Sequence, residues 1–419
     1  MTRMRRTDPL ASPEEKFGRL RSILENLKEI NHPYAARMAE RGVRPEHIRG
    51  RGDLPLLPAT TKYDLLRSYP TGWIAGERKE IARIHATNGT TGKPVIVACT
   101  AGDIRMWAEN MAWCMGLSGV GEDDVVQISF AYGLFTGGLG YHYGAELLGA
   151  AVIPASAGFT DRQTILMKDL GATVLACTPS YALRISENLA GKGREGISLR
   201  LGFFGGETWS DELRGVLEKS LGIKAIDLYG LSEAMGPGVA AECPEQNGLH
   251  ISDDFIAEIL DPVTLEPKEE GEGELVLTSW SRRAYPLIRY RTRDLASLMT
   301  GSCPCGEPSP RMSRVRGRSD DMLIFRGVGV FPSQVEAAVC VVPGLSPSYQ
   351  IRAWKENGLQ NISFVCERAP DARPDDMPRA ADELAKSVKN VTGAAIPFEI
   401  LEPGGIPRSD GKTVRVLKQ

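Results

Sequence analysis

A short segment rich in glycine, threonine and lysine has the residue types that bind phosphate. It runs from Thr87 to Lys93 and follows a strand-like stretch, residues 81–86. Glycines and small hydroxyl residues let backbone N–H groups close around phosphate oxygens, and the lysine adds positive charge. It is not a Walker loop, because Thr87 stands where that motif needs glycine and Pro94 where it needs serine or threonine. We predict a phosphate-binding loop, with an ordinary hairpin turn as the alternative.

Two later segments carry groups that could hold the rest of a nucleotide. Tyr229 and Glu233 directly follow a predicted strand. The aromatic ring could stack on a purine, and the carboxylate could hold Mg²⁺ beside phosphate oxygens. Asp294 ends a charged run, residues 289–294, and could accept hydrogen bonds from ribose hydroxyls. The alternatives are a core tyrosine at a strand end and a solvated surface strand.

Two further motifs suggest a moving part. Gly317 and the charged residues that follow it, up to Asp321, could form a hinge that absorbs a backbone rotation. Lys412 lies on a glycine-bearing loop near the end of the sequence and could supply charge to a developing negative oxygen. An ordinary linker and a solvated lysine are the alternatives.

Three cysteines and one histidine could form a metal site. Cys243 and His250 make a C-x₆-H pair, and Cys303 and Cys305 make a C-x-C pair. Three thiolates and one imidazole form a closed tetrahedral set, which for zinc means a structural role. The spacing differs from that of a standard zinc knuckle, so four unrelated residues near turns are the alternative.

Length and composition narrow the class of protein. A chain of 419 residues is expected to form at least two domains. Hydrophobic residues make up 42% and charged residues 25%, as in ordinary globular proteins, and the net charge of −3 gives no reason to expect nucleic acid or a membrane surface as partner. No apolar run approaches the length of a membrane span, and the start lacks the apolar core of a secretory signal. The eight cysteines suggest reduced thiols in the cytoplasm.

Alternating strand-like and helical runs between residues 81 and 230 predict βαβ units around a largely parallel sheet, with the chemistry in loops beyond the carboxyl ends of the strands. The strand-like runs are residues 94–99, 124–130, 151–155, 172–177, 199–204 and 225–228. The helical runs are residues 103–117, 141–148, 161–170, 181–189 and 210–221. We therefore predict an α/β protein with a large N-terminal domain, residues 1–317, whose last part from about residue 240 is an antiparallel β subdomain. Residues 318–419 are predicted to form a small, mobile α+β lid domain.

In this order, the motifs resemble those of the adenylate-forming superfamily of acyl-CoA synthetases, luciferases and peptide-synthetase adenylation domains. The closer match is to phenylacetate–CoA ligase and related aryl-CoA ligases. The resemblance spans roughly residue 15 to the C-terminus. Besides the glycine-rich loop and the tail lysine, it depends on residues 132–138, 229–238, 290–295 and 317–334.

The resemblance implies an AMP-forming ligase with two half-reactions. A carboxylate attacks the α-phosphate of MgATP to give acyl-adenylate and pyrophosphate, and the thiol of coenzyme A then displaces AMP. The implied catalytic residues are Lys412, Glu233 and Thr87, with Glu233 also holding Mg²⁺ and Asp320 as the hinge. The implied nucleotide-binding residues are Asn88, Gly89, Thr90, Thr91, Gly92, Lys93, Gly205, Gly206, Glu207, Asp227, Tyr229, Gly230, Asp294 and Arg318.

The resemblance also implies where the acid and the thiol bind. Tyr132 and Phe135 are the expected walls of an aryl pocket, with Trp107, Trp113 and Tyr141 as weaker candidates. The remaining pocket residues are Gly137, Gly206, Gly230 and Pro237. The loop expected to face coenzyme A contains Gly327, Val328 and Gly329.

Departures from the family pattern bear on both substrates. Asn88 replaces the usual serine, Gly206 the usual alanine and Gly329 the usual asparagine. The change at Gly206 permits a larger or substituted acid, and the change at Gly329 leaves the acceptor open.

We therefore predict ATP-dependent activation of an aromatic acid of the phenylacetate, benzoate or anthranilate type, followed by transfer to coenzyme A. One alternative is a stand-alone adenylating enzyme that loads a carrier-protein phosphopantetheine or an amine. The other is a non-catalytic nucleotide-binding sensor. A homodimer is possible by resemblance alone.

Overall fold

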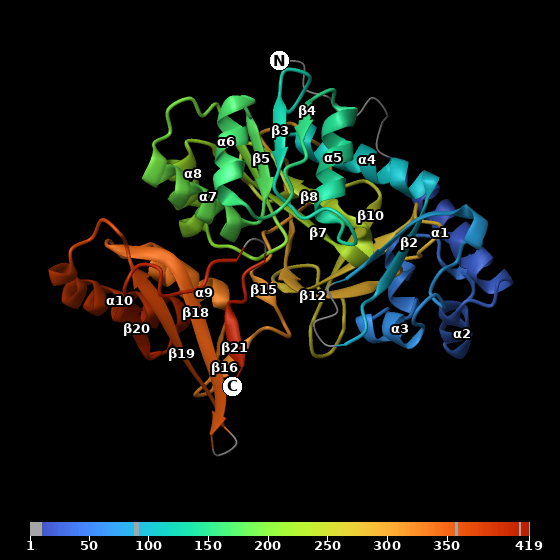
Figure 1. Cartoon of the computed structure of the whole chain (residues 1–419). Helices are drawn as coiled ribbons and strands as arrows, with labels where there is room; N and C mark the ends of the chain where they lie inside the picture. Colours follow the sequence, from blue (N-terminus) through green and yellow to red (C-terminus); the bar gives the residue numbers. More distant parts are fainter. Residues whose placement is uncertain (1–10, 88–91, 357–358, 410–411, 419) are drawn as a thin grey trace.

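The computed structural model describes residues 11–87, 92–356, 359–409 and 412–418 (Figure 1). The elements from β16 (Leu323–Phe325) to the end, orange to red in Figure 1, form a small unit at the lower left of the view. This small unit has its own core, which contains apolar residues between Leu323 and Ile396. The elements up to β15 (Gly317–Arg318) form the large unit.

The largest sheet lies in the large unit and has the strand order β13-β14-β9-β8-β7-β6-β5-β3-β4. Strands β4, β3, β5, β6 and β7 run parallel, whereas β8, β9, β14 and β13 continue the sheet in antiparallel pairs. The strands are β3 (Val125–Ile128), β4 (Ala151–Ile153), β5 (Val174–Cys177), β6 (Leu201–Phe204), β7 (Lys224–Leu231), β8 (Gly236–Glu242), β9 (Leu249–Ile251), β13 (Leu298–Met299) and β14 (Arg311–Met312).

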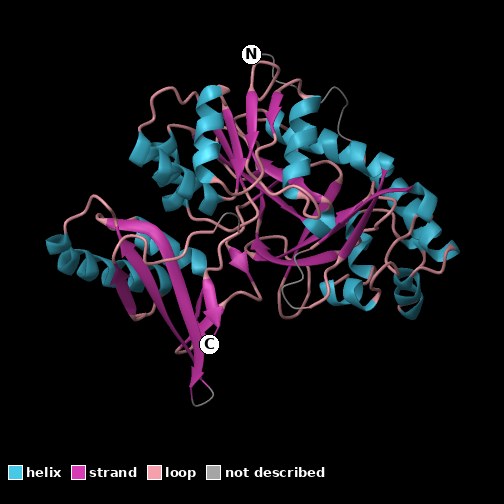
Figure 2. Ribbon diagram, in the orientation of Figure 1, coloured by secondary structure: helices cyan, strands magenta, loops and turns pink. Residues whose placement is uncertain are grey.

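Helices cover both faces of this sheet (Figure 2). They are α4 (Ala101–Gly116), α5 (Gly137–Leu147), α6 (Thr160–Asp169), α7 (Pro179–Lys192) and α8 (Asp211–Leu221). Side chains alternate along a strand, so Val126 of β3 packs in the core formed with α4 and α5, whereas Val125 packs in the core formed with α6 to α8. The predicted parallel α/β architecture is confirmed.

One predicted strand belongs elsewhere. The run 94–99 was expected in the parallel sheet, but β2 (Ile96–Thr100) pairs antiparallel with β1 (Ile81–Ala86) in a separate two-stranded sheet. A parallel crossover needs a dozen or more residues. Ala86 is opposite Ile96, and the connection between them is too short for a crossover.

A second, antiparallel sheet of the large unit lies within the range predicted for the β subdomain, although β9, β13 and β14 of that range belong to the largest sheet. This second sheet has the order β10-β11-β12-β15, with β10 (Phe255–Leu260), β11 (Gly273–Ser279) and β12 (Tyr290–Ala296). Helices α1 (Pro13–Glu29), α2 (Pro33–Glu40) and α3 (Lys62–Arg67) share a hydrophobic core with it. The side chain of Ser12 caps α1 in a capping box with Glu15, which explains where this helix begins.

The small unit is an α+β structure. Its main sheet has the order β20-β19-β18-β21, in which a long β18–β19 hairpin is flanked by two parallel strands. The elements are β17 (Val328–Val330), α9 (Pro332–Cys340), β18 (Leu345–Glu356), β19 (Leu359–Arg368), α10 (Met377–Thr392), β20 (Phe398–Leu401) and β21 (Val416–Lys418). Among the described residues, none of the helices has the length and apolar character required to span a membrane.

Candidate active site

The predicted phosphate loop joins β1 to β2. Asn88, Gly89, Thr90 and Thr91 lie outside the described residues. The two ends of the loop are held together, because the N–H of Thr87 donates to Val95 O at 3.0 Å and the N–H of Val95 donates to Thr87 Oγ1 at 3.0 Å. Gly92 has φ +131°, a conformation that favours glycine. Lys93 Nζ lies 4.9 Å from the ring centroid of Tyr69.

Three of the predicted nucleotide residues form one connected group. The hydroxyl of Tyr229, at the end of β7, donates to Asp294 Oδ2 at 2.5 Å. Arg318 pairs with Asp294 across β12 and β15, and their charged atoms are 3.7 Å apart. Arg318 also donates to both carboxylate oxygens of Asp320, the predicted hinge residue, at 2.9 and 3.1 Å. Burial raises the pKa of Asp294 to about 6, although Arg318 and Tyr229 act in the opposite direction.

Glu233, the predicted Mg²⁺ ligand, lies buried in the turn between β7 and β8. Its backbone carbonyl accepts a hydrogen bond from Arg282. Arg282 is fully buried in the large unit, so it holds the position of this turn.

The tail lysine lies beside the Gly205–Glu207 segment, which follows β6. Lys412 Cε would be 3.4 Å from a Cβ atom at Gly206, and Gly206 has φ +81°. The N–H of Thr413 donates to Glu207 Oε1 at 2.5 Å, and the hydroxyl of Ser180 donates to Glu207 Oε2 at 2.6 Å. The contacts of Lys412 and Thr413 bring together residues more than 200 positions apart in the sequence.

The glycines of this region have steric reasons to be glycine. A Cβ atom at Gly205 would lie 2.2 Å from Leu228 O, and one at Gly230 would lie 2.1 Å from Gly236 O. A side chain at position 206 would have to adopt a left-handed backbone conformation, which favours glycine. Glycine at position 206, where the family usually has alanine, therefore suits the backbone conformation there.

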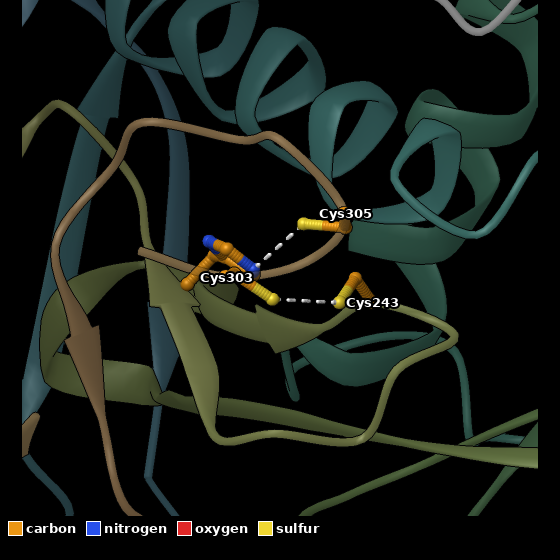
Figure 3. A group of neighbouring side chains, drawn as sticks. Cys243, Cys303 and Cys305 are labelled. Carbon is orange, nitrogen blue, oxygen red and sulfur yellow. Dashed lines mark hydrogen bonds between the residues drawn. The ribbon is translucent and has the colours of Figure 1, made fainter. Parts of the chain in front are cut away.

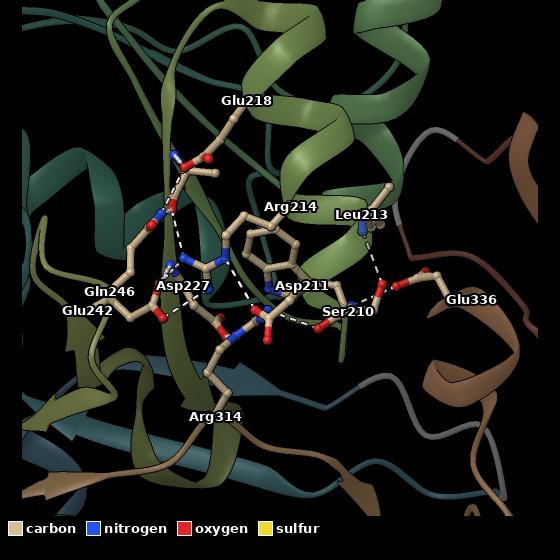
Figure 4. Close-up of polar contacts among 12 residues, drawn as sticks. Ser210, Asp211, Leu213, Arg214, Glu218, Asp227, Glu242, Gln246, Arg314 and Glu336 are labelled. Carbon is tan, nitrogen blue, oxygen red and sulfur yellow. Dashed lines mark hydrogen bonds and ion pairs between the residues drawn. The ribbon is translucent and has the colours of Figure 1, made fainter. Parts of the chain in front are cut away.

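Asp227 occupies a different environment from the one its predicted role suggests. Its Oδ2 accepts from Arg314 Nε at 2.8 Å, and its N–H donates to Glu242 Oε2 at 2.8 Å (Figure 4). Glu242 in turn accepts from Arg214 Nη1 and Nη2 at 2.8 and 2.9 Å. Asp227 thus belongs to a structural ion-pair network, and its binding of nucleotide stays a prediction.

Several of the predicted acid-pocket residues lie near one another. Gly230 pairs with Pro237 between β7 and β8, and Pro237 O accepts from Trp107 Nε1 at 2.7 Å. The two expected walls of the aryl pocket have different surroundings. Tyr132 OH is 3.2 Å from His142 Nδ1. The side chain of Phe135 is 40% exposed.

The other candidates differ in their surroundings. Trp113 is buried in α4. A Cβ atom at Gly137 would lie 3.2 Å from Phe130. Tyr141 is fully buried and stacks on Phe130 at 5.2 Å between centroids.

Phe130 and Thr178 were missed in the sequence. Both are within 4.0 Å of the position that a Gly206 Cβ would take, at 3.9 and 4.0 Å respectively. Phe130 lies two residues after the carboxyl end of β3, and Thr178 directly follows that of β5. Ligand-binding residues of parallel sheets occur at these ends, so the position of both residues along the chain could have identified them.

The loop predicted to face coenzyme A is the hairpin between β16 and β17. Gly327 has φ +84°, and Val328 and Gly329 belong to β17. A Cβ atom at Gly329 would lie 2.7 Å from Sδ of Met322, an exposed side chain that could move aside, so the structure does not explain why glycine stands where the family usually has asparagine.

The four predicted metal ligands come together in the structure, and Figure 3 shows the three cysteines of this group side by side. One ligand atom from each of Cys243, His250, Cys303 and Cys305 lies within 4.8 Å of all the others. His250 Nε2 is 3.3 Å from Cys305 Sγ, while its other ring nitrogen is 3.2 Å from Ser309 Oγ. A partner on the outer ring nitrogen is the usual arrangement around a metal-binding histidine. The donor set therefore fits a tetrahedral zinc ion.

Comparisons with known proteins agree with this architecture. The sequence model of the AMP-binding enzyme family matches residues 61–280, and that of the AMP-binding enzyme C-terminal domain matches residues 327–419. A phenylacetate-coenzyme A ligase from Pseudomonas putida is 43% identical over 411 residues, which cover 96% of this chain and 93% of the relative. The chain belongs to the adenylate-forming superfamily of AMP-binding enzymes.

Two crystal structures of 2-hydroxyisobutyryl-CoA ligase match this chain to different extents. The ligase in the postadenylation state with 2-HIB-AMP has a TM-score of 0.91 and 25% identity, covering 97% of this chain and 89% of the ligase. The ligase with 2-HIB-AMP and CoA in the thioesterification state has a TM-score of 0.71 and 26% identity over the same shares. The overall arrangement of this chain is thus more similar to the first of these two structures.

Proposed function

We propose that this protein activates an aromatic carboxylic acid with ATP, releasing pyrophosphate to form an acyl-adenylate, and then transfers the acyl group to coenzyme A. The 43% identity to a phenylacetate-coenzyme A ligase over nearly the whole chain supports an arylacetate or a related aryl acid as substrate. The AMP-binding family match supports the nucleotide.

The contact of the Lys412–Thr413 segment with Gly206 and Glu207 is the observation that carries the proposal. Attack on the α-phosphate gathers negative charge on oxygens, so the protein's task is to position the reactants and to neutralise charge. A lysine ammonium beside the segment that follows a central strand can do both. The greater similarity to the postadenylation state of 2-hydroxyisobutyryl-CoA ligase is consistent with a first-step arrangement.

The other roles follow from the same proposal. Thr87 and the loop after it hold the terminal phosphates, Tyr229 and the Gly205–Glu207 segment contact adenine, and Asp294 accepts from the ribose. Glu233 would hold Mg²⁺, which would neutralise phosphate charge.

A pyrophosphate-release screen over aromatic carboxylic acids tests the proposal, with mass analysis of the products in the presence of coenzyme A. Acid-dependent pyrophosphate release with formation of acyl-CoA supports it. Accumulation of acyl-AMP without acyl-CoA would favour a carrier protein or an amine as acceptor. Absence of acid-dependent release for every acid would refute the ligase and favour a nucleotide sensor.

The titration of Asp294 predicts how ATP binding depends on pH. Because its pKa is raised to about 6, the carboxylate that accepts from ribose is lost as the pH falls through this value. We expect KM for ATP to rise about tenfold between pH 7 and pH 5, since one pH unit below the pKa about a tenth of the group stays ionised. In Asp294→Asn, KM should be high at pH 7 and nearly independent of pH.

The titration of Asp294 would not itself destabilise the fold at low pH. A carboxyl whose pKa is higher in the folded than in the unfolded state favours folding more strongly as the pH falls below that value. Thermal denaturation at pH 5 and pH 7 provides the control. An unchanged KM across this range would contradict a role of Asp294 in ATP binding.

We also propose that Cys243, His250, Cys303 and Cys305 hold a structural zinc ion. We expect about one zinc per chain by elemental analysis, and a lower melting temperature after chelation, because closed zinc sites stabilise the fold around them. Cys305→Ser should lose the metal, whereas Cys366→Ser, at a buried cysteine of the small unit, should retain it. Stoichiometric zinc in Cys305→Ser would contradict this ligand set.

Cytoplasmic location and a homodimer also stay proposals. The first depends on the cysteine composition and the second on family resemblance, and light scattering on the purified protein tests the second.

A further inference from the structure

Among the described residues, three polar contacts join the small unit to the large unit in this arrangement, besides the hydrogen bond that Ser333 Oγ donates to Arg316 O where the two units connect. Thr413 donates to Glu207, Glu336 of α9 accepts from the N–H of Ser210, and Arg408 pairs with Glu187 of α7. The first belongs to the segment that carries Lys412. The other two have no role in the proposed chemistry, which raises the question of what they do.

Arg408 is held firmly within its own unit. Its Nη1 and Nη2 donate to Glu367 Oε1 and Oε2 at 3.0 and 2.8 Å, and Nη1 also donates to Ile406 O at 3.0 Å. Glu367 is buried and also accepts from the N–H of Ile406 at 2.5 Å. These contacts lie within the small unit, so they persist whichever way this unit is oriented. The guanidinium is therefore preorganised.

The remaining donors of Arg408 point across the boundary. Nε donates to Glu187 Oε2 at 3.2 Å, and Nη2 donates to Glu187 Oε1 at 3.1 Å. This bidentate pair is half-buried, with side chains 27% and 34% exposed. A fork of two parallel hydrogen bonds requires one relative orientation of the two groups. The pair therefore exists only when the small unit docks as it does here.

The position of Arg408 in the sequence links this pair to the tail lysine. Arg408 lies four residues before Lys412, and Thr413 directly follows the lysine. The Lys412 segment is thus anchored to the large unit on both sides, by Arg408 to Glu187 and by Thr413 to Glu207. Loss of one anchor would let the lysine leave the Gly206 site more often.

Glu336 makes a second contact between the same two units, independent of Arg408. It is fully buried, and its Oε2 accepts from the N–H of Ser210, the residue that caps α8, at 2.8 Å (Figure 4). Figure 4 shows Glu336 reaching from the small unit to the start of this helix. The Ser210 amide is therefore protected from solvent exchange by a residue of the other unit.

We propose that Arg408 and Glu187 are a positioning pair for the first half-reaction: they hold the Lys412 segment against the large unit during adenylation and separate for thioester formation. The proposal rests on the ligase function proposed above. It assigns neither residue a contact with substrate.

Glu187→Gln removes the charge of the pair and leaves the small unit's own contacts intact. We expect acyl-AMP formation to slow about five- to tenfold, the range expected for a partly buried bidentate ion pair. Thioester formation from supplied acyl-AMP should be unchanged or faster. Glu187→Asp should retain part of the first-step rate. Glu195→Gln, at an exposed acid that makes no ion pair among the described residues, is the matched control and should leave both steps unchanged.

Hydrogen–deuterium exchange tests docking without reference to catalysis. In Glu187→Gln the peptide that contains Ser210 should exchange faster, although Glu187 does not contact Ser210, and Glu195→Gln should match the parent protein. An equal loss in both half-reactions, an unchanged first step, or unchanged exchange at Ser210 would overturn the pair's positioning role. Lack of acid activation by the parent protein would instead refute the ligase function, and the exchange measurement would still decide whether the pair holds the two units together.

Discussion

Lys412→Ala is expected to lose acyl-AMP formation by at least about 10²–10³-fold, the usual cost of removing one preorganised charge-stabilising group. Lys412 Cε lies beside Gly206, where the acid and the α-phosphate are proposed to react, and the neighbouring Thr413 is fixed by Glu207. The second half-reaction needs no such charge. Thioester formation from supplied acyl-AMP should therefore proceed at nearly the parent rate.

Pyrophosphate release and single-turnover thioester formation measure the two steps separately. Lys386→Ala, an exposed lysine on α10 of the same unit, is the control and should leave both rates unchanged. A proportional loss of both steps in Lys412→Ala would contradict a role confined to adenylation.

Glu242→Leu is expected to destabilise the large unit by about 3–5 kcal/mol, because the buried guanidinium of Arg214 loses its buried carboxylate partner and keeps only the exposed Asp211, whose Oδ1 is 3.5 Å from Arg214 Nε. Glu242 is completely buried and accepts hydrogen bonds from Arg214 and from the N–H of Asp227. The midpoint of urea unfolding, followed by circular dichroism, should fall markedly. The exposed Glu269→Leu, which breaks no ion pair among the described residues, should change it little.

The double variant Arg214→Met/Glu242→Leu separates the cost of an unpaired charge from the worth of the pair. Buried ion pairs replaced by apolar groups are often neutral in stability. We expect the double variant to recover most of the loss, but not all, because the N–H of Asp227 still lacks its acceptor. If the double variant is as unstable as Glu242→Leu, the unpaired charge is not the cause.

Much of the fold followed from local patterns. The alternation of strand-like and helical runs predicted the parallel sheet. Apolar residues repeat every 2 residues in a strand and every 3.6 residues in a helix, and each period is visible within a single segment. The error at residues 94–99 arose because a strand's period does not reveal its partner; only the short connection to β1 excludes a parallel crossover.

The candidate site was predictable in part. The motifs that carry Tyr229, Asp294 and Arg318 were recognised separately, and the structure connects them through hydrogen bonds and charge. Phe130 and Thr178 were missed because an aromatic or a threonine after a strand is not distinctive by itself. The ion pair of Asp227 with Arg314 was also missed, because it joins residues 87 positions apart.

The sequence by itself determined the glycine turns, the order of helices and strands and the residue types available for phosphate, carboxylate and metal chemistry, because these depend on backbone sterics and short-range periodicity. Only the tertiary structure decided that Lys412 reaches Gly206, that Arg408 faces Glu187 and that Cys243 meets Cys303. The reason is physical: such contacts depend on how sheets and units dock, and docking is set by the fit of whole surfaces that no local pattern contains.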